Sequence, residues 1–528
     1  MTYNILISDP LHKEGITPLL NHKDIHVDIH TDLTSEQLVA KIGSYDGLLV
    51  RSQTQVTKEL LEHARNLKIV GRAGVGVDNI DLDAATERGI IVVNAPNANT
   101  NSAAEHTMAM IMALSRKIPQ AYFALKNHQW DRKNYVGVEL KNKTLGIIGL
   151  GRIGTEVAYR AKGQRMKVFA YDPFLSPEKA EKMGIAFGTL EEVLKTSDFI
   201  TVHTPLMKET KHLINEEAFN LMKPGVQIVN CARGGIIDEE ALYKAIISKK
   251  VAGAALDVFE KEPIHHHVLL ELPEVIATPH LGASTVEAQK NVTIDVSEDV
   301  VNFFAGDVVR NPVNIPSLPL DTMNKLAHHL TLAEKLGTLL IHLTEEAIEE
   351  ISVIFAGDLS DMEVSAFTRR TVRTILRRHL GPHVNEVNAL YLAKKRGIII
   401  HQGKTSEKND FTNLLTLHLK TTSGTGCISG TILNGLGARI VEINGYRVDI
   451  IPEGHIVFIH HTDQPGVIGR LGSLLAEYNI NIATMQVDRS DVGGDAIMVL
   501  KIDRKIDIHV VHEIQAMMEI NDVKAIDL

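Results

Sequence analysis

The stretch TLGIIGLGRIGTEVAYRAK, residues 144–162, holds a G-x-G-x-x-G pattern made by Gly149, Gly151 and Gly154. An apolar run precedes the glycines and a helical pattern follows them. Gly149 permits a tight turn, Gly151 lets the backbone approach a ligand, and Gly154 lets helix and strand pack closely. Free N–H groups at the start of the helix would bind phosphate. The stretch therefore predicts a strand–turn–helix unit that binds a dinucleotide.

Asp172 ends the next apolar run, 18 residues after Gly154. A carboxylate at that point can accept hydrogen bonds from a ribose diol and repels a 2′-phosphate. The three residues that follow it are Pro, Phe and Leu, with no Lys or Arg among them. We therefore expect NAD rather than NADP as the cofactor. The alternative is an ordinary glycine turn followed by a surface aspartate.

Working outward, apolar runs alternate with helical patterns before residue 97 and again over 143–281, which predicts parallel sheets built from βα units. We expect one helix from Ser102 to about Leu125 and another from about Ser284 to Phe304. The run Asn311–Leu320 contains Pro312, Pro316 and Pro319, and it is expected to be a linker.

Length and composition limit the class of protein. A chain of 528 residues exceeds one ordinary core, so three or four domains are expected. A net charge of −10 argues against a nucleic-acid partner. The two cysteines, Cys231 and Cys427, fit a reducing cytoplasm. The sequence has no run of 18 apolar residues and no basic N-terminal segment, so we expect no membrane span and no signal peptide.

Three further residues suit the reduction of a 2-keto acid. Arg233 lies in NCARGG, Glu262 in DVFEKEP and His280 in TPHLGAS, and each follows an apolar run. A guanidinium can bind carboxylate and keto oxygens together. A histidine paired with a carboxylate can exchange a proton with the developing alkoxide. Taken singly, each has an ordinary alternative: a salt-bridge partner, a surface glutamate and a loop histidine.

Taken in order, these motifs resemble the D-2-hydroxyacid dehydrogenase family over roughly residues 45–315. The resemblance implies Arg233, Glu262 and His280 as the catalytic set. It also implies a two-domain cleft, in which a Rossmann-type domain is inserted into a flavodoxin-like substrate domain. The implied cofactor-binding residues are Gly149, Gly151, Arg152, Ile153, Gly154, Asp172, Thr204 and Asp257.

Segments of the first domain resemble the phosphoglycerate dehydrogenase branch of that family, whose arginines surround a substrate phosphate. The motifs are VRSQT, GRAGVGVDN, NAPNANT and WDRK. The resemblance implies 3-phosphoglycerate as the substrate, with one arginine coming from a neighbouring subunit. The implied substrate-binding residues are Arg51, Arg72, Gly74, Asn97 and Arg132. For Arg51 or Arg132 alone, a surface salt bridge is the alternative.

After residue 454 the order of patterns is strand, helix, strand, strand, helix, strand, which predicts a ferredoxin-like unit. The segment HHTDQPGVIGRLGSLLAEYNINIATM resembles an ACT domain, a regulatory module that binds amino acids. It implies L-serine as an effector bound between two copies of the unit. The implied effector residues are His461, Asp463, Val467 and Asn481. The alternative is that the tail only holds subunits together.

The expected fold is therefore α/β throughout. We expect a substrate-binding domain at 1–97 plus 285–316, an NAD-binding domain at 98–284, an intervening domain of mixed α/β pattern at 317–450, and a ferredoxin-like ACT domain at 451–528. The protein is expected to be a cytoplasmic homo-oligomer, a tetramer by resemblance. Residue 264 begins the run Ile-His-His-His, which we interpret as a loop and not as a metal site, because adjacent residues rarely converge on one ion.

Two other functions are also compatible with the sequence. One is another reductase of the same family, acting for example on hydroxypyruvate or glyoxylate, which would need no phosphate-binding arginines. The other is a non-enzymatic, NAD-sensing corepressor built on the same fold. Related corepressors keep catalytic-looking residues, so Arg233, Glu262 and His280 do not exclude this second function.

Overall fold

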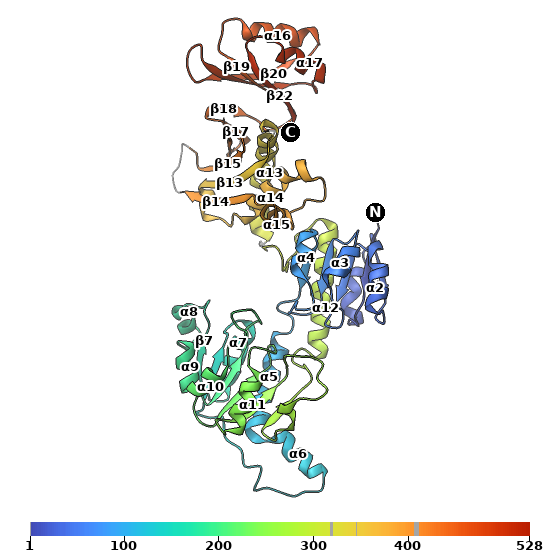
Figure 1. Ribbon diagram of the computed structural model, residues 1–528, viewed down its shortest axis with the longest axis vertical. Coiled ribbons are helices and arrows are strands. Elements are labelled where there is room, and N and C mark those ends of the chain that lie inside the picture. Colours follow the sequence, from blue (N-terminus) through green and yellow to red (C-terminus); the bar gives the residue numbers. More distant parts are fainter. Residues whose placement is uncertain (1, 317–319, 345, 406–410) are drawn as a thin grey trace.

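Four β-sheets follow one another along the molecule within the residues that the computed structural model describes, 2–316, 320–344, 346–405 and 411–528 (Figure 1). The second sheet in the sequence lies at one end of the long axis. The first sheet lies between it and the two C-terminal sheets. Among the helices of these ranges, none has both the length and the apolar character needed to cross a bilayer.

The first sheet is parallel, with strand order β2-β1-β3-β4-β5. This is the flavodoxin-like order. Helices cover both faces, so a central strand such as β3 is buried at every position. The strands are β1 (Tyr3–Ile7), β2 (Ile25–Ile29), β3 (Gly47–Val50), β4 (Ile69–Arg72) and β5 (Ile91–Asn94), and the helices are α1 (Thr17–Leu20), α2 (Ser35–Lys41), α3 (Lys58–His63) and α4 (Leu82–Glu87).

Helix α12 (Val286–Ala305) returns the chain to this first sheet, where it packs against β4 and β5. The predicted return is confirmed. The two crossings between the sheets are joined by a hydrogen bond between the hydroxyls of Ser102 and Thr285, 2.7 Å apart.

The run that follows α12 is not a linker over its first part, and that prediction was wrong. The amide of Val313 donates to the carbonyl of Val92, and the side-chain oxygen of Asn314 accepts from the amide of Val92. These bonds add the run to the edge strand β5. The prediction relied on prolines, but Pro312 lies at an antiparallel bridge to Val93, on a sheet edge where proline is tolerated. Pro319 lies outside the described residues.

The second sheet is also parallel and has the order β12-β11-β10-β9-β6-β7-β8. The strand order reverses between β6 and β9, so that β7 and β8 lie on one side of β6 and β9 to β12 on the other, as in Rossmann folds. The strands are β6 (Thr144–Ile148), β7 (Lys167–Tyr171), β8 (Ala186–Phe187), β9 (Phe199–Val202), β10 (Val226–Asn230), β11 (Val251–Leu256) and β12 (Val275–Ala277), and the helices after them are α7 (Arg152–Gly163), α8 (Pro177–Lys182), α9 (Leu190–Thr196), α10 (Glu216–Leu221) and α11 (Glu239–Ile247).

The single helix expected over 102–125 is two helices, α5 (Thr100–Arg116) and α6 (Ile118–Lys126). Lys117 breaks the helix with a φ of 54°, in the left-handed region. The physical reason is Pro119, which has no N–H to continue the ladder and whose ring would clash with the carbonyl of Ser115. That carbonyl accepts from the amide of Val138 instead.

The third sheet is mixed, with order β14-β13-β15-β16-β17-β18. Helix α15 of this unit contacts α4 of the first domain. There Asn385 donates to the carbonyl of Gly89 over 2.8 Å, and Lys395 forms an ion pair with Glu87. The elements are α13 (Leu320–Leu343), β13 (Ile348–Gly357), α14 (Ser365–Leu380), α15 (Ala389–Lys395), β14 (Ile399–Thr405), β15 (Asn413–Thr421), β16 (Thr425–Leu433), β17 (Gly437–Ile443) and β18 (Tyr446–Ile450).

The fourth sheet has the predicted ferredoxin-like arrangement, with antiparallel order β20-β21-β19-β22. Strand side chains alternate between its two faces. Val457 and Ile459 face α16 and α17, whereas Ile456 and Phe458 belong to the hydrophobic core of the third sheet. The elements are β19 (His455–Thr462), α16 (Val467–Glu477), β20 (Ile482–Arg489), β21 (Asp495–Ile502), α17 (Ile508–Gln515) and β22 (Ile520–Asp527). The two C-terminal units therefore share one core.

The shared core predicts that a cavity on one face of β19 loosens both C-terminal units. Phe458→Ala removes a buried ring and is expected to cost about 3–5 kcal/mol. Hydrogen exchange should rise in β16 of the third sheet as well as in β21 of the fourth. Leu471→Ala, a change in α16 on the other face, serves as the control and should raise exchange in the fourth sheet alone. Unchanged exchange in β16 after Phe458→Ala would show that the two units unfold independently.

Candidate active site

The glycine loop between β6 and α7 has the shape that a dinucleotide needs. Gly149 has a φ of 94°, and a Cβ there would lie 2.7 Å from the carbonyl oxygen of His203. A Cβ at Gly154 would lie 2.1 Å from the carbonyl oxygen of Gly149. At Gly151, by contrast, no described heavy atom lies within 4 Å of the position of a Cβ. The middle glycine therefore faces open space at the start of a helix.

The polar groups around this loop fit NAD. The hydroxyl of Thr204, just after β9, is buried and has no hydrogen-bond partner among the described residues. Thr204 touches the loop, since its Cγ2 lies 2.9 Å from where a Cβ of Gly149 would be. Asp172 accepts from the amides of Leu150 and Phe174, both at 2.8 Å, which holds its carboxylate at the end of β7. A bound dinucleotide would meet a free hydroxyl, uncapped helix amides and a carboxylate.

Arg152 and Ile153 occupy the first turn of α7. The Arg152 side chain is exposed and its Nη1 lies 3.5 Å from the carbonyl of Pro96, at the crossing between the domains. Ile153 is half-buried and packs against the core of the second sheet. Their backbone amides lie at the helix N-terminus, where phosphate binds.

The three predicted catalytic residues follow three neighbouring strands. Arg233 comes after β10, Glu262 after β11 and His280 after β12, so all three lie beyond the carboxyl edge of one parallel sheet. Their loops are close-packed, because a Cβ at Gly234 would lie 1.9 Å from the carbonyl oxygen of Phe259. Ligands of open α/β sheets bind at this edge.

His280 and Glu262 form a hydrogen-bonded pair whose geometry suits proton transfer. Nδ1 of His280 lies 2.7 Å from Oε2 of Glu262, and the amide of Phe259 donates to Oε1 over 3.0 Å. Burial alone would raise the pKa of Glu262, but the bonds from His280 and Phe259 outweigh it and lower that pKa. The ionised carboxylate only accepts hydrogen bonds, so Nδ1 of His280 carries the proton. Nε2 is then the nitrogen with a free lone pair, which can accept a proton.

Asp257 holds the loop that carries His280. It is 1% exposed, and its carboxylate accepts from the amides of Leu281 and Gly282 and the hydroxyl of Thr278, over 2.6–2.9 Å. These bonds fix His280 at a φ of 55°, a conformation that a non-glycine residue adopts only when its surroundings enforce it. The geometry gives Asp257 a positioning role. Its predicted contact with the cofactor stays a prediction.

Arginines from the first domain face this edge. Burial, reinforced by the nearby charges of Arg233 and Arg51, lowers the pKa of Arg72 to about 10, so Arg233 and Arg51 both lie close enough to Arg72 to repel its charge. The buried Nε of Arg72 has no partner among the described residues. Gly74 lets that guanidinium lie against the backbone, since a Cβ there would lie 1.7 Å from its Nη1. The carboxylates of Asp78 and Asp9 offset part of this charge, but three guanidinium groups against two carboxylates leave an excess of positive charge, as expected of a site for an anionic ligand.

The remaining predicted substrate residues, Asn97 and Arg132, are both exposed. Asn97 is exposed on the crossing between the domains, where its carbonyl accepts from the amide of Thr100. Arg132 is exposed and belongs to the irregular segment after α6. Figure 1 shows that α6 and this segment lie at the end of the second domain that is farther from the first domain. Within one chain the structure therefore does not bring Arg132 to the arginine cluster.

The predicted effector residues do not form one site within a single chain. Asp463 follows β19 at the end where Thr462 pairs with Asp495, whereas Asn481 precedes β20 at the end where Ile482 pairs with Ile502. Eight residues of strand separate the two ends by roughly 25 Å. Asp463 accepts from Nη1 of Arg489 over 2.7 Å, and Asn481 donates to Asp503 over 2.9 Å.

His461 and Val467, the other two predicted effector residues, are buried within the single chain. Their side chains are 2% and 1% exposed, because His461 lies on the central strand β19 and Val467 begins the buried face of α16. The amide of Val467 donates to the carbonyl of Gln464 over 3.4 Å. Direct contact between these two side chains and an effector on the surface is therefore not supported.

Sequence reasoning missed three residues of the site. Asp78 forms a 2.9 Å ion pair with Nε of Arg233 across the two domains. His106 on α5 lies 3.2 Å from Asp257 and supports the His280 loop. Asp9 binds the loop of Arg51. Asp9 follows an apolar strand directly, a signal that was available, whereas His106 sits in a helix with nothing to mark it.

The three consecutive histidines are part of an ordinary loop. His267 binds Glu239 over 2.9 Å and accepts from the amide of Leu269, capping a short 3-10 helix. Among the described residues no group of three or more potential ligands could hold a metal ion.

Comparisons with known proteins agree with this geometry. Residues 108–282 match the model of the D-isomer specific 2-hydroxyacid dehydrogenase NAD binding domain, 325–444 that of the D-3-phosphoglycerate dehydrogenase intervening domain, and 455–517 that of the ACT domain. A D-lactate dehydrogenase from Aquifex aeolicus, solved with NAD and lactic acid, is 33% identical. It covers 60% of this chain and 100% of its own, with a TM-score of 0.54.

The fold and the site thus define an NAD-dependent dehydrogenase of the D-isomer specific 2-hydroxyacid class. D-3-phosphoglycerate dehydrogenase of Bacillus subtilis is 46% identical over 100% of both chains, and that of Methanocaldococcus jannaschii is 44% identical over 99% of both. The chain belongs to the D-3-phosphoglycerate dehydrogenase family. This relationship excludes the non-enzymatic corepressor considered from the sequence.

The open space at Gly151 predicts that a larger side chain there weakens cofactor binding without preventing folding. Gly151→Val should fold, but its side chain would fill the approach of the pyrophosphate. NADH binding, followed by nucleotide fluorescence, should weaken at least about tenfold, or about 1.4 kcal/mol. Gly163→Val is the matched control, because that position at the other end of α7 is equally open. Equal NADH affinity in the two variants would remove the glycine loop from the cofactor site.

Proposed function

We propose that the protein oxidises D-3-phosphoglycerate to 3-phosphohydroxypyruvate with NAD, the first step of L-serine biosynthesis, and acts in the cytoplasm. The observation that carries the proposal is the cluster of Arg51, Arg72 and Arg233 beside the His280–Glu262 pair. A substrate with a carboxylate at one end and a phosphate at the other supplies the negative charge that this cluster lacks. The names of the full-length relatives support the same substrate.

The residues divide the chemistry among them. Nε2 of His280 takes the proton of the C2 hydroxyl as the C2–H bond breaks, and the carboxylate of Glu262 stabilises the imidazolium that results. Arg233 binds the carboxylate and the oxygen on C2, which becomes the keto oxygen. NAD, when bound, accepts the hydride. In the reverse direction the same imidazolium returns its proton.

A phosphate-free hydroxy acid, the substrate of a hydroxypyruvate or glyoxylate reductase, fits less well. It would bring no second anionic group to Arg51 and Arg72. Burying a cation is costly, and the carboxylates of Asp78 and Asp9 offset only part of that cost at Arg72, whose pKa stays lowered.

The mechanism predicts that turnover depends on His280, and that loss of another histidine paired with a glutamate in the same domain has little effect. His280→Ala should keep its NADH affinity and lose about 10²- to 10⁴-fold in kcat. The matched control is His212→Ala, because His212 pairs with Glu260 over 3.0 Å in the same domain. Near-normal turnover of 3-phosphoglycerate by His280→Ala, measured as NADH formation, would refute its assignment as the base.

We further propose a homo-oligomer, a tetramer by analogy, in which Arg132 completes the site of a neighbouring subunit. Helix α6 supports this, because it displays exposed apolar side chains at one-turn spacing: Ile118, Tyr122 and Leu125 are 53–62% exposed. Trp130, two residues from Arg132, is 81% exposed. Such a surface is typical of a subunit interface, and its burial would carry Arg132 to the partner.

We also propose that L-serine binds between the ACT domains of two chains. In an antiparallel pair, Asp463 of one chain and Asn481 of the other can meet, which a single chain does not allow. The carboxylate of Asp463 suits the ammonium of an amino acid, and the N-terminus of α16 suits its carboxylate.

Calorimetry on the full-length protein tests this effector site. L-serine at millimolar concentration should release or absorb heat, and Asp463→Asn should weaken binding at least about tenfold, since it removes a charged partner. Asp522→Asn, which changes the charge of β22 equally, should bind as the wild type does. Absence of heat from the wild-type oligomer would leave the ACT domain as an assembly module.

A further inference from the structure

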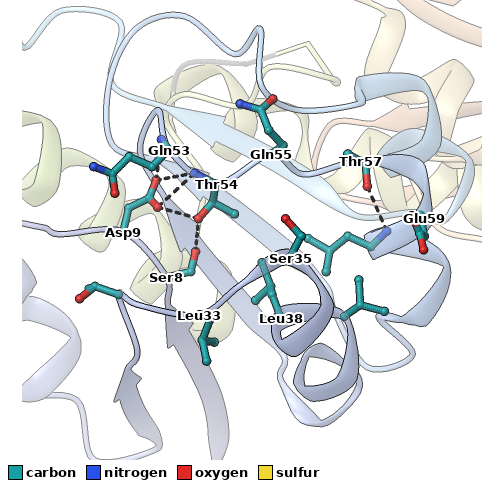
Figure 2. A pocket seen from close by; sticks show the side chains of 13 residues that line it. Ser8, Asp9, Leu33, Ser35, Leu38, Gln53, Thr54, Gln55, Thr57 and Glu59 are labelled. Atoms are coloured by element: carbon teal, nitrogen blue, oxygen red, sulfur yellow. Dashed lines mark hydrogen bonds between the residues drawn. The ribbon is translucent and has the colours of Figure 1, made fainter. Parts of the chain in front are cut away.

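The loop of residues 51–54, which carries Arg51, is hydrogen-bonded to one buried carboxylate, that of Asp9. Asp9 is 1% exposed and lies directly beyond β1. Its Oδ2 accepts from the amides of Arg51 over 2.6 Å and Gln53 over 3.2 Å. Its Oδ1 accepts from the hydroxyl of Thr54 over 2.6 Å and from the Thr54 amide over 3.1 Å. Figure 2 shows Asp9 facing Gln53 and Thr54 at the end of the sheet.

The carbonyl groups of the same loop are bound by an amide side chain, that of Asn79. The side-chain nitrogen of Asn79 donates to the carbonyl of Arg51 over 2.8 Å and to the carbonyl of Thr54 over 2.7 Å. Asn79 follows Asp78, the ion-pair partner of Arg233. The carboxylate therefore binds the amides of the loop while Asn79 binds its carbonyls, so both ends of the loop backbone are fixed.

We propose that Asp9 and Asn79 are positioning residues that set the phosphate specificity of the enzyme by fixing Arg51. We call the two side chains the loop clamp. The inference rests on the proposed function, because it assigns Arg51 to the substrate phosphate. Both carboxylate oxygens of Asp9 and both N–H groups of the Asn79 side chain are directed at the loop: Asp9 accepts from four donors, and the side-chain nitrogen of Asn79 donates to two carbonyls.

A clamp of this kind is needed because Arg51 lies on a loop and not on a strand. An arginine bound to phosphate acts through directed hydrogen bonds, so its backbone must be held before the substrate arrives. The backbone amide of Arg51 is itself one of the groups that Asp9 binds. Loss of the carboxylate would release the loop while leaving Arg233, Glu262 and His280 in the other domain untouched.

The test is steady-state kinetics of the full chain with NAD and 3-phosphoglycerate. Asp9→Asn should raise KM for 3-phosphoglycerate about ten- to a hundredfold, the range expected when charge-assisted hydrogen bonds to phosphate are lost. KM for NAD and kcat should change little. In an Arg51→Ala background, Asp9→Asn should add no further rise in KM, because its effect runs through Arg51.

Asp46→Asn is the matched control. Asp46 accepts from the amide of Asn4 over 3.0 Å and pairs with Lys68, at the opposite edge of the same sheet. It should lower stability without raising KM. An equal rise in KM from Asp46→Asn, or additive effects of Asp9→Asn and Arg51→Ala, would overturn the proposal. Should Asp9→Asn fail to fold, Thr54→Val removes only the Thr54 hydroxyl, with its bonds to Asp9 and Ser8. It should give a smaller rise in KM of the same kind, and an unchanged KM there would overturn the proposal.

Failure of the substrate assignment can be told apart from failure of the clamp. A wild type that does not oxidise 3-phosphoglycerate, or an Arg51→Ala variant with normal KM, contradicts the proposed function. The clamp is then judged by hydrogen exchange of the amides of residues 51–54. Exchange there must rise in Asp9→Asn and not in Asp46→Asn, and equal exchange in the two variants would refute the clamp.

Discussion

The active site depends on one geometric constraint, that the carboxyl edges of two parallel sheets must face each other. A parallel sheet sends every loop that follows a strand to the same edge. One sheet thereby gathers Arg233, Glu262 and His280, and the other gathers Arg51 and Arg72. The chain meets the constraint by crossing between the sheets twice, and by returning α12 to the first sheet. The ion pair of Asp78 with Arg233 closes the gap between the two edges.

The third sheet is attached to this arrangement through a contact of α15 and the segment before it with the first domain, in which Val387 joins the core of the first sheet. Helix α15 holds the C-terminal end of α4, while the loop before α4 carries Asp78 and Asn79. The contact with the third sheet and the groups that hold Arg233 and Arg51 thus lie at opposite ends of the same short helix, α4. The contact involves Glu87 and Gly89 on one side and Asn385 and Lys395 on the other.

Much of the fold could be predicted from the sequence, because apolar periodicity and the glycine pattern are local signals. The strand-end positions of Arg233 and His280 were predictable for the same reason. The break at Lys117 was signalled by Pro119 and was overlooked. The strand-like pairing of residues 311–314 could not be seen, since it depends on Val92 more than 200 residues earlier. The distance between Asp463 and Asn481 could not be predicted from the motif either, because it is set by the register of the strands and not by their separation in the sequence.

The core shared by the third and fourth sheets has a consequence for how such chains can be rearranged. Ile456 and Phe458 of the ACT unit complete the core that Leu417 and Ile428 begin in the intervening unit. If a truncation or gene rearrangement divided the chain between residues 450 and 455, the two parts would not be independently folded domains. The division would expose an apolar sheet face on each fragment, and both fragments would be prone to aggregate. In evolution, the two C-terminal units of this chain are therefore expected to be gained or lost together.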